Sequence, residues 1–73
     1  MKQKMIKSSA YVVEALPNTQ FLVELENKKQ IRAYLSGKMR KFKIKVLVGD
    51  NVIIELSPLI PISNQVGRII LRK

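Results

Sequence analysis

The sequence predicts an all-β domain: a five-stranded barrel with one short helix between its third and fourth strands. Three observations carry this prediction. Five short segments alternate apolar and polar residues at every second position, as strands with one buried face do. Turn-forming residues separate these segments. The chain has 73 residues, 47% of them hydrophobic and 26% charged. That composition is typical of a folded protein with one small core, so we expect residues 1–73 to form one domain.

The first three strands form a predicted meander. Residues 6–16 are rich in Tyr and Val and are expected to form a long first strand. Residues 17–19 supply a turn, because proline presets φ and asparagine tolerates turn geometry. A second strand is expected over residues 20–25. After the polar turn at residues 26–29, a third strand covers residues 30–35, with Arg32 and Tyr34 on its outward parity.

The apolar period changes after the third strand. Ser36 is placed to accept a hydrogen bond at a helix start, and Met39, Phe42 and Val46 follow at helical spacing. We therefore expect one or two helical turns, with Met39 and Phe42 turned toward the core. Residues 44–48 also alternate as a strand would, so a strand there stays the alternative.

The last two strands complete the barrel. Gly49 and Asp50 form a turn before a fourth strand at residues 52–56, which Pro58 ends because proline cannot donate to a strand ladder. Residues 59–65 are uncharged and contain a second proline, which indicates a loop. The fifth strand is expected over residues 66–73. Its alternation places two apolar residues on one face, Ile69 and Leu71, and three residues on the other, Arg68, Ile70 and Arg72.

This order of elements matches the OB-fold, a partly open Greek-key barrel that binds oligonucleotides across strands 2 and 3 and the adjacent loops. An SH3-like barrel is the alternative, but it lacks the helix between the third and fourth strands.

The charge of the chain indicates its class of partner. Lys and Arg number 14 against 5 Asp and Glu, which gives a net charge of +9. Such an excess attracts polyanions, so nucleic acid or an anionic membrane surface is the first expectation and a merely soluble basic domain is the plain alternative. No apolar run reaches the roughly 18 residues of a membrane helix. Lys7 interrupts the apolar residues near the N-terminus, so we expect neither a membrane span nor a signal peptide.

Charge is densest in residues 36–45, the basic segment, which holds five cations and no acid. An isolated run of this kind is often only a solvated helix face. Charge of one sign at this density repels itself, and a phosphate backbone would relieve that repulsion. The five candidate contacts are Lys38, Arg40, Lys41, Lys43 and Lys45.

Outward positions on the third and fifth strands supply further candidates. Arg32, Arg68 and Arg72 suit bidentate contact with phosphate, and Tyr34 is able to stack on a base. A sequence-tolerant binder of single strands needs several aromatic platforms. With Phe21 and Phe42 expected inside, at most Tyr11 and Tyr34 remain, so recognition of structured RNA by shape and backbone is favoured over a cold-shock type of function.

Enzymatic chemistry finds little support. The chain has no histidine or cysteine, and its carboxylates are spread over strands and turns without a pairing that spacing suggests. Neither a P-loop nor a dinucleotide-binding fingerprint is present. We expect no catalytic residue, no metal site and no cofactor. The absence of cysteine fits a reducing compartment.

A set of short motifs resembles bacterial-type translation initiation factor one. The resemblance covers Glu14 to Pro58 and resumes at Gly67. The six-residue run from Ser36 to Lys41 is its most specific part, because it stands in register with Leu-Pro-Asn upstream and Gly-Asp downstream. The motifs that carry it are Leu16-Pro17-Asn18, Leu25-Glu26-Asn27, Ser36-Gly37-Lys38-Met39-Arg40-Lys41, Gly49-Asp50 and Gly67-Arg68-Ile69.

The resemblance implies an OB-fold factor without catalysis, which binds the small ribosomal subunit at the aminoacyl-tRNA site. It implies contact with the decoding helix of 16S-type rRNA and with a neighbouring ribosomal protein, and support of the other initiation factors in placing initiator tRNA. We expect a monomer when the protein is free. Carried over by position, the rRNA-facing residues are Lys38, Arg40, Lys41, Lys43, Lys45, Arg68 and Arg72, with Arg32 and Tyr34 as weaker candidates.

The sequence departs from the family pattern at four places. Ala10 stands where members usually have glycine in the first strand, and Lys28 where a glycine commonly follows the Glu-Asn turn. Tyr34 stands where many members have histidine. Residues 59–66 are longer, apolar and uncharged, where members often have a short link that contains Tyr-Asp. No contact of that loop is therefore carried over.

Two readings from other classes stay open: a general RNA chaperone of similar fold, and a protein-interaction module whose basic face meets an acidic partner. The richness in Lys, Ile and Asn is typical of AT-rich coding sequence. Together with the expected absence of a targeting segment, it fits both the bacterial cytoplasm and the plastid stroma.

Overall fold

A computed structural model describes residues 5–73 and confirms the predicted five-stranded barrel with a short helix. Each strand lies where the alternation predicts it, to within one residue at either end. Residues 1–4 of the expected domain lie outside the described residues. The elements are β1 (Ile6–Leu16), β2 (Gln20–Leu25), β3 (Gln30–Leu35), α1 (Gly37–Lys41), β4 (Asn51–Leu56), the 3₁₀ helix η1 (Ile62–Asn64) and β5 (Gly67–Arg72).

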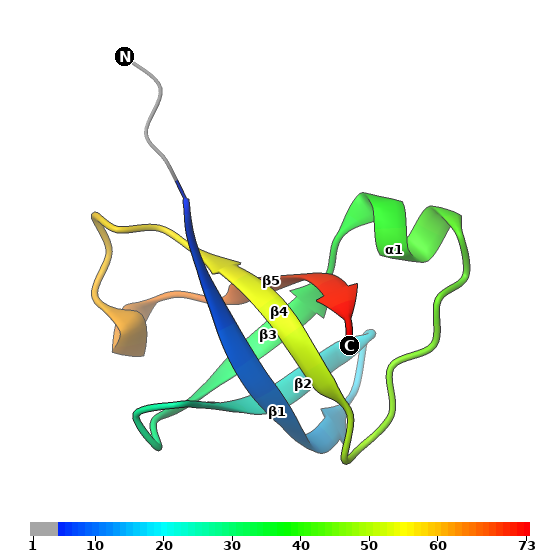
Figure 1. Cartoon of the computed structure of the whole chain (residues 1–73), viewed down its shortest axis with the longest axis horizontal. Helices are drawn as coiled ribbons and strands as arrows, with labels where there is room; N and C mark the ends of the chain where they lie inside the picture. The colour runs from blue at the N-terminus through cyan, green and yellow to red at the C-terminus, as the bar shows by residue number, and fades with distance from the viewer. Residues whose placement is uncertain (1–4) are drawn as a thin grey trace.

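The five strands close into a barrel in the order β1-β2-β3-β5-β4 (Figure 1). The pairing of β3 with β5 is parallel and the other pairings are antiparallel. The long strand β1 closes the barrel because it pairs with both β2 and β4; Ala10, for example, lies opposite Leu25 on one side and Val52 on the other. Closure removes the open edges of a sheet, which protects a small β domain from edge-to-edge association.

The core fills the barrel with the inward residues of all five strands. Gly67 lies at the start of β5, where an added Cβ would come within 3.2 Å of the Ile54 Cδ1 and 3.3 Å of the Ile31 Cδ1, so a larger residue would require these core side chains to shift. The buried apolar residues are Ala10, Val12, Phe21, Val23, Leu25, Ile31, Ala33, Met39, Val46, Val52, Ile54, Leu56 and Ile69.

An irregularity in β5 corrects the predicted faces of that strand. Ile53 pairs with Leu71 but Ile54 pairs with Ile69, so Ile70 is an extra residue and the alternation reverses after it. Leu71, expected to face the core with Ile69, is 55% exposed. Arg72 lies opposite the inward residue Val52 and therefore does not share a face with Arg68.

Two hairpin turns use left-handed backbone at residues other than glycine. Asn18 and Thr19, between β1 and β2, have φ of 63° and 56°. They are the last two residues of the three-residue connection 17–19, and the Gln20 N–H donates to the Pro17 carbonyl across them at 3.4 Å. Lys28, between β2 and β3, has φ of 71°. This is the left-handed region that glycine adopts without strain, so a lysine stands in this turn where the backbone favours glycine.

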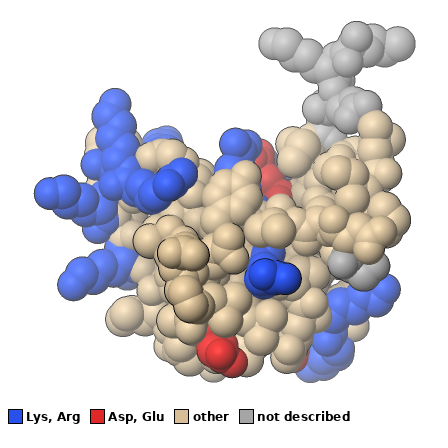
Figure 2. All heavy atoms as spheres, turned by 180° about the vertical axis from the view of Figure 1, so that it is seen from behind, with Lys and Arg blue, Asp and Glu red and all other residues tan. Residues whose placement is uncertain are grey.

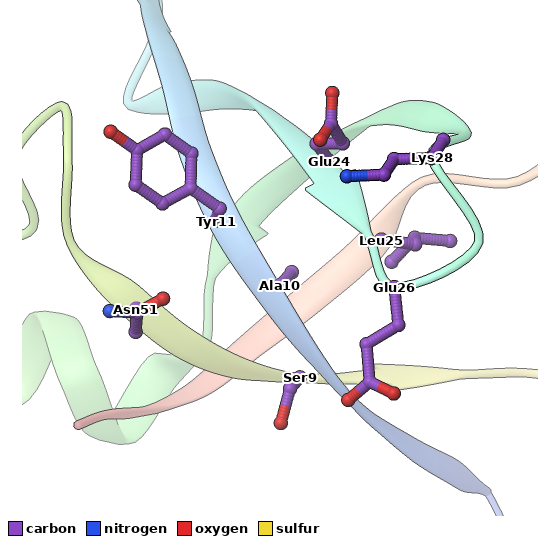
Figure 3. Close-up of a pocket in the computed structure, with 8 residues that line it drawn as sticks. All are labelled: Ser9, Ala10, Tyr11, Glu24, Leu25, Glu26, Lys28 and Asn51. Carbon is purple, nitrogen blue, oxygen red and sulfur yellow. The ribbon is translucent and has the colours of Figure 1, made fainter.

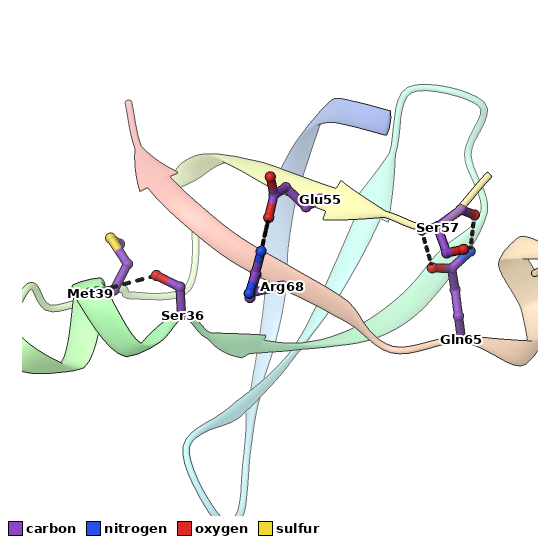
Figure 4. Close-up of polar contacts among 6 residues, drawn as sticks. All are labelled: Ser36, Met39, Glu55, Ser57, Gln65 and Arg68. Atoms are coloured by element: carbon purple, nitrogen blue, oxygen red, sulfur yellow. Dashed lines mark hydrogen bonds and ion pairs between the residues drawn. The ribbon is translucent and has the colours of Figure 1, made fainter. Parts of the chain in front are cut away.

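The connection between β4 and β5, residues 57–66, is the predicted loop with one turn of 3₁₀ helix. The Gln65 side chain closes it. Its Oε1 accepts the Ser57 N–H at 2.8 Å, and its Nε2 donates to the Ser57 carbonyl at 3.0 Å (Figure 4). The same Nε2 also donates to the Ile60 carbonyl at 2.8 Å. Ile62 packs against the core. Three hydrogen bonds and one apolar contact thus hold an uncharged loop in shape.

Candidate nucleic-acid interface

Helix α1 is anchored at its start by Ser36, as predicted. The Ser36 Oγ accepts the Met39 N–H at 3.2 Å (Figure 4), and the Ser36 N–H donates to the Ile69 carbonyl on β5 at 2.9 Å. Met39 is only 2% exposed and belongs to the core. A side-chain cap and a buried methionine thus fix a five-residue helix that has little intrinsic stability.

The helix ends abruptly at Lys41. Phe42 is the C-cap residue and Lys43 has a left-handed φ of 53°. The Lys43 N–H donates to the Arg40 carbonyl and the Ile44 N–H to the Met39 carbonyl, both at 3.1 Å, which is the Schellman arrangement. Residues 44–48 form neither a second helical turn nor the alternative strand.

The predicted inward position of Phe42 is wrong: the side chain is 61% exposed. Helix α1 ends at Lys41, one residue before Phe42, so the helical spacing that predicts an inward Phe42 does not extend to that residue. Its ring lies beside Lys41, with the Lys41 Nζ 5.9 Å from the ring centroid. Three aromatic side chains are therefore exposed instead of two, but they lie on different elements: Tyr11 on β1, Tyr34 on β3 and Phe42 at the end of α1.

The path from Phe42 to β4 is fixed by buried and hydrogen-bonded anchors. Val46 is 7% exposed and packs in the core. The Asp50 carboxylate accepts the Leu47 N–H at 2.8 Å, and the Gly49 N–H donates to the Val12 carbonyl at 2.9 Å. An open groove runs between α1 and this path; Met39, Ile44 and other apolar residues line it together with the cations Arg40, Lys43 and Lys45.

All five cations of the basic segment point into solvent. Figure 2 shows Lys and Arg side chains gathered at the α1 end of the molecule. No carboxylate lies within the segment, and none of the five takes part in an ion pair within residues 5–73. The segment thus presents concentrated positive charge on a backbone that is fixed at both ends. The exposed members are Lys38, Arg40, Lys41, Lys43 and Lys45.

Arg72 joins the basic segment through the end of β5. Its Nη1 donates to the Lys45 carbonyl at 2.9 Å. The extra residue at Ile70 makes this contact possible, because it turns Arg72 away from the face that carries Arg68. Six of the nine predicted contacts therefore lie together.

The other three candidates lie apart, on the outer face of β3 and β5. Tyr34 and Arg68 are neighbours in the sheet register, while Arg32 lies two residues from Tyr34 and opposite Leu22. Glu55 on β4 forms an ion pair with Arg68 (Figure 4) and, by its hydrogen bond and its charge, raises the pKa of that guanidinium above the ordinary value. Glu55 thus offsets part of the charge of Arg68 within the protein.

A hollow beside the β2–β3 hairpin differs from the basic segment in its charge. Figure 3 shows Glu24, Glu26 and Lys28 around it, with Tyr11 on the neighbouring strand. Mixed charge of this kind does not favour a polyanion. Among residues 5–73, no three His, Cys, Asp or Glu side chains lie close enough to hold a metal ion, and no helix is long and apolar enough to cross a membrane.

Comparisons with known proteins find a matching family model and several similar structures. The family model described as "Translation initiation factor 1A / IF-1" matches residues 1–73. The solution structure of translation initiation factor one from the Wolbachia endosymbiont strain TRS of Brugia malayi is 35% identical, with a TM-score of 0.77 over 94% of this chain and 78% of that one. YjeQ from Thermotoga maritima is 26% identical, with a TM-score of 0.71 over 93% of this chain, which spans 23% of YjeQ.

Proposed function

Because the chain belongs to the family of translation initiation factors 1A and one, we propose that it binds the small ribosomal subunit at the aminoacyl-tRNA site during initiation. There it contacts the decoding helix of 16S-type rRNA and a neighbouring ribosomal protein, and supports the other initiation factors in placing initiator tRNA. The family is one of translation initiation factors rather than a class of enzymes. We place the protein with the ribosomes of a bacterial cytoplasm or a plastid stroma.

The observation that carries this proposal is the basic segment. Five exposed cations without an ion-pair partner in residues 5–73 stand on a short stretch of chain that Ser36, Met39 and Val46 attach to the barrel. Each phosphate contact releases condensed counterions, so a segment of this kind binds RNA strongly at low salt. Because the backbone is already ordered, little conformational entropy is lost on binding.

The candidate residues take three roles in this proposal. Lys38, Arg40 and Lys41 contact phosphates from α1, and Lys43 and Lys45 extend the contact along the following loop. Arg72 contributes charge and also holds the Lys45 carbonyl, so it positions the loop. Arg32, Tyr34 and Arg68 flank the interface on the barrel, and Glu55 weakens the contribution of Arg68.

Competition with tRNA tests the proposed position. Labelled protein is titrated with isolated small subunits that carry tRNA in the aminoacyl site and with subunits that do not. We expect the tRNA to displace the protein. Equal binding in both conditions contradicts the decoding-site proposal. A general RNA chaperone would instead bind unstructured RNA oligomers about as tightly as subunits, and a module for an acidic protein would show no subunit binding at physiological salt.

A further inference from the structure

The Phe42 side chain is exposed to solvent within the basic segment, the most cationic part of the chain. It is the C-cap residue of α1, stands between Lys41 and Lys43, and is 61% exposed. A single exposed apolar side chain is common on protein surfaces and by itself needs no explanation. The position of Phe42 does need an explanation, because its large apolar ring stands among cations that are suited to bind phosphate.

The backbone beneath the ring is fixed. The Phe42 N–H donates to the Lys38 carbonyl at 3.1 Å, and the two Schellman hydrogen bonds of Lys43 and Ile44 close the chain immediately after it. With a fixed backbone and only two side-chain torsions, a phenylalanine presents its ring at small entropic cost. Lys41 Nζ, 5.9 Å from the ring centroid, adds a cation at the ring.

RNA offers two chemically different surfaces to this segment: phosphate oxygens, which the cations match, and the faces of unstacked bases, which match an aromatic ring. We propose that Phe42 stacks on an unstacked base of the RNA whose phosphates the basic segment contacts. This inference rests on the proposed function and adds a second kind of contact, insensitive to charge, to the same surface.

Phe42 is the exposed aromatic residue best placed for this role within residues 5–73. Tyr34, 38% exposed, lies on β3 beside Arg68, whose charge Glu55 offsets. Tyr11, 47% exposed, lies on β1 with its hydroxyl near the Gly49 turn. Neither ring belongs to the basic segment.

Replacement of Phe42 by leucine tests the inference, since Phe42→Leu keeps an apolar side chain and removes the aromatic face. We expect binding to small subunits to weaken by about 5- to 150-fold, the range expected for one base–aromatic stack. The salt dependence should stay that of the wild type, because no charge changes. Phe42→Tyr should retain affinity. Leu59→Ala is the matched control; it removes an exposed apolar side chain, 68% exposed, from the loop at the other end of the barrel.

A second variant reports the contact directly. The chain has two tyrosines and no tryptophan, so Phe42→Trp introduces its only tryptophan, which is excited at wavelengths that tyrosine does not absorb. On binding to subunits, its emission should be quenched and should become inaccessible to acrylamide. Thermal unfolding of each variant should match the wild type, since the side chain that changes is exposed.

The outcomes separate this inference from the proposed function. If wild-type protein does not bind subunits, the proposed function fails and the inference fails with it. If the wild type binds and Phe42→Leu binds equally well, only the inference is overturned, because the aromatic face then contributes nothing to binding. Tryptophan emission at position 42 that stays accessible to acrylamide in the complex likewise overturns it.

Discussion

Two long connections between strands protrude from the barrel, and we call them the 36–50 and 57–66 excursions. They differ in charge and in the contacts that order them. Residues 36–50 connect β3 to β4 and carry α1, while residues 57–66 connect β4 to β5 and carry η1; they lie at opposite ends of the molecule (Figure 1). The first holds five exposed cations, whereas the second holds no charge at all. Backbone hydrogen bonds and two buried apolar side chains, Met39 and Val46, fix the first; the Gln65 side chain fixes the second.

The difference separates rigidity from recognition. Both excursions are ordered by a small number of specific contacts, so order by itself does not identify a binding surface. Only the 36–50 excursion combines order with a dense group of cations, the five of the basic segment, whose charge a polyanionic partner would neutralise. The comparison predicts that changes in the first excursion alter binding, while changes in the second alter stability alone.

The largest expected effect follows from removing two cations from α1. Arg40→Ala with Lys41→Ala should weaken subunit binding by on the order of 10- to 100-fold at about 0.1 M salt, because each lost phosphate contact removes one set of released counterions. Thermal unfolding should be unchanged, since both side chains are exposed. Equilibrium binding and a melting curve check this pair of expectations. A large loss of thermal stability would mean that these side chains do not face solvent.

A change in the uncharged loop should have the opposite signature. Gln65→Ala removes three hydrogen bonds to the backbone of residues 57–60 and should lower the free energy of unfolding by about 1–3 kcal/mol. Subunit affinity should remain that of the wild type under conditions where the variant is folded. Urea denaturation and equilibrium binding measure the two quantities. Weakened binding by a fully folded Gln65→Ala protein would show that the loop belongs to the interface.

The smallest expected effect separates stability from binding at one residue. Lys43 has φ of 53°, a conformation that glycine adopts without strain, so Lys43→Gly should stabilise the fold by about 0.5–1 kcal/mol. The same change removes one cation and should weaken subunit binding. Lys28→Gly, at φ of 71° in the β2–β3 turn, is the matched control and should stabilise the fold similarly without weakening binding. Equal losses of affinity in both variants would indicate that net charge alone governs association.

The barrel was predictable from sequence because its strands obey a simple alternation. Apolar residues at every second position, Phe21, Val23 and Leu25 among them, mark strands whose inward face is fully buried. Ser36 and Gly49 marked a helix start and a turn for local reasons that hold whatever the rest of the chain does.

The predicted side-chain positions were wrong where tertiary structure interrupts a local pattern. The helical period suggested a buried Phe42, but the chain takes a left-handed turn at Lys43, a residue that carries no sequence signal for that conformation. In β5, the extra residue at Ile70 exposes Leu71 and moves Arg72 to the basic segment. No turn residue marks that bulge, so only the pairing with β4 reveals it.

The candidate site was predictable as a list of cations but not as an arrangement. Charge density selected the basic segment, and its five cations are exposed. The ion pair between Glu55 and Arg68 joins residues 13 positions apart, so nothing in the local sequence indicates that Arg68 is engaged. The same holds for the contact of Arg72 with the Lys45 carbonyl, 27 positions away.

The salt dependence of subunit binding tests the central claim most directly, when it is compared between two variants that lose the same charge. One is Arg40→Ala with Lys41→Ala; the other is Lys28→Ala with Lys29→Ala, in the β2–β3 turn. The slope of log affinity against log salt is negative. We predict that it becomes shallower by about two units in the first variant, roughly one unit per lost contact, and stays at the wild-type value in the second. Equal slopes in the two variants would contradict the proposed interface, because the protein would then bind through its overall charge rather than through the basic segment.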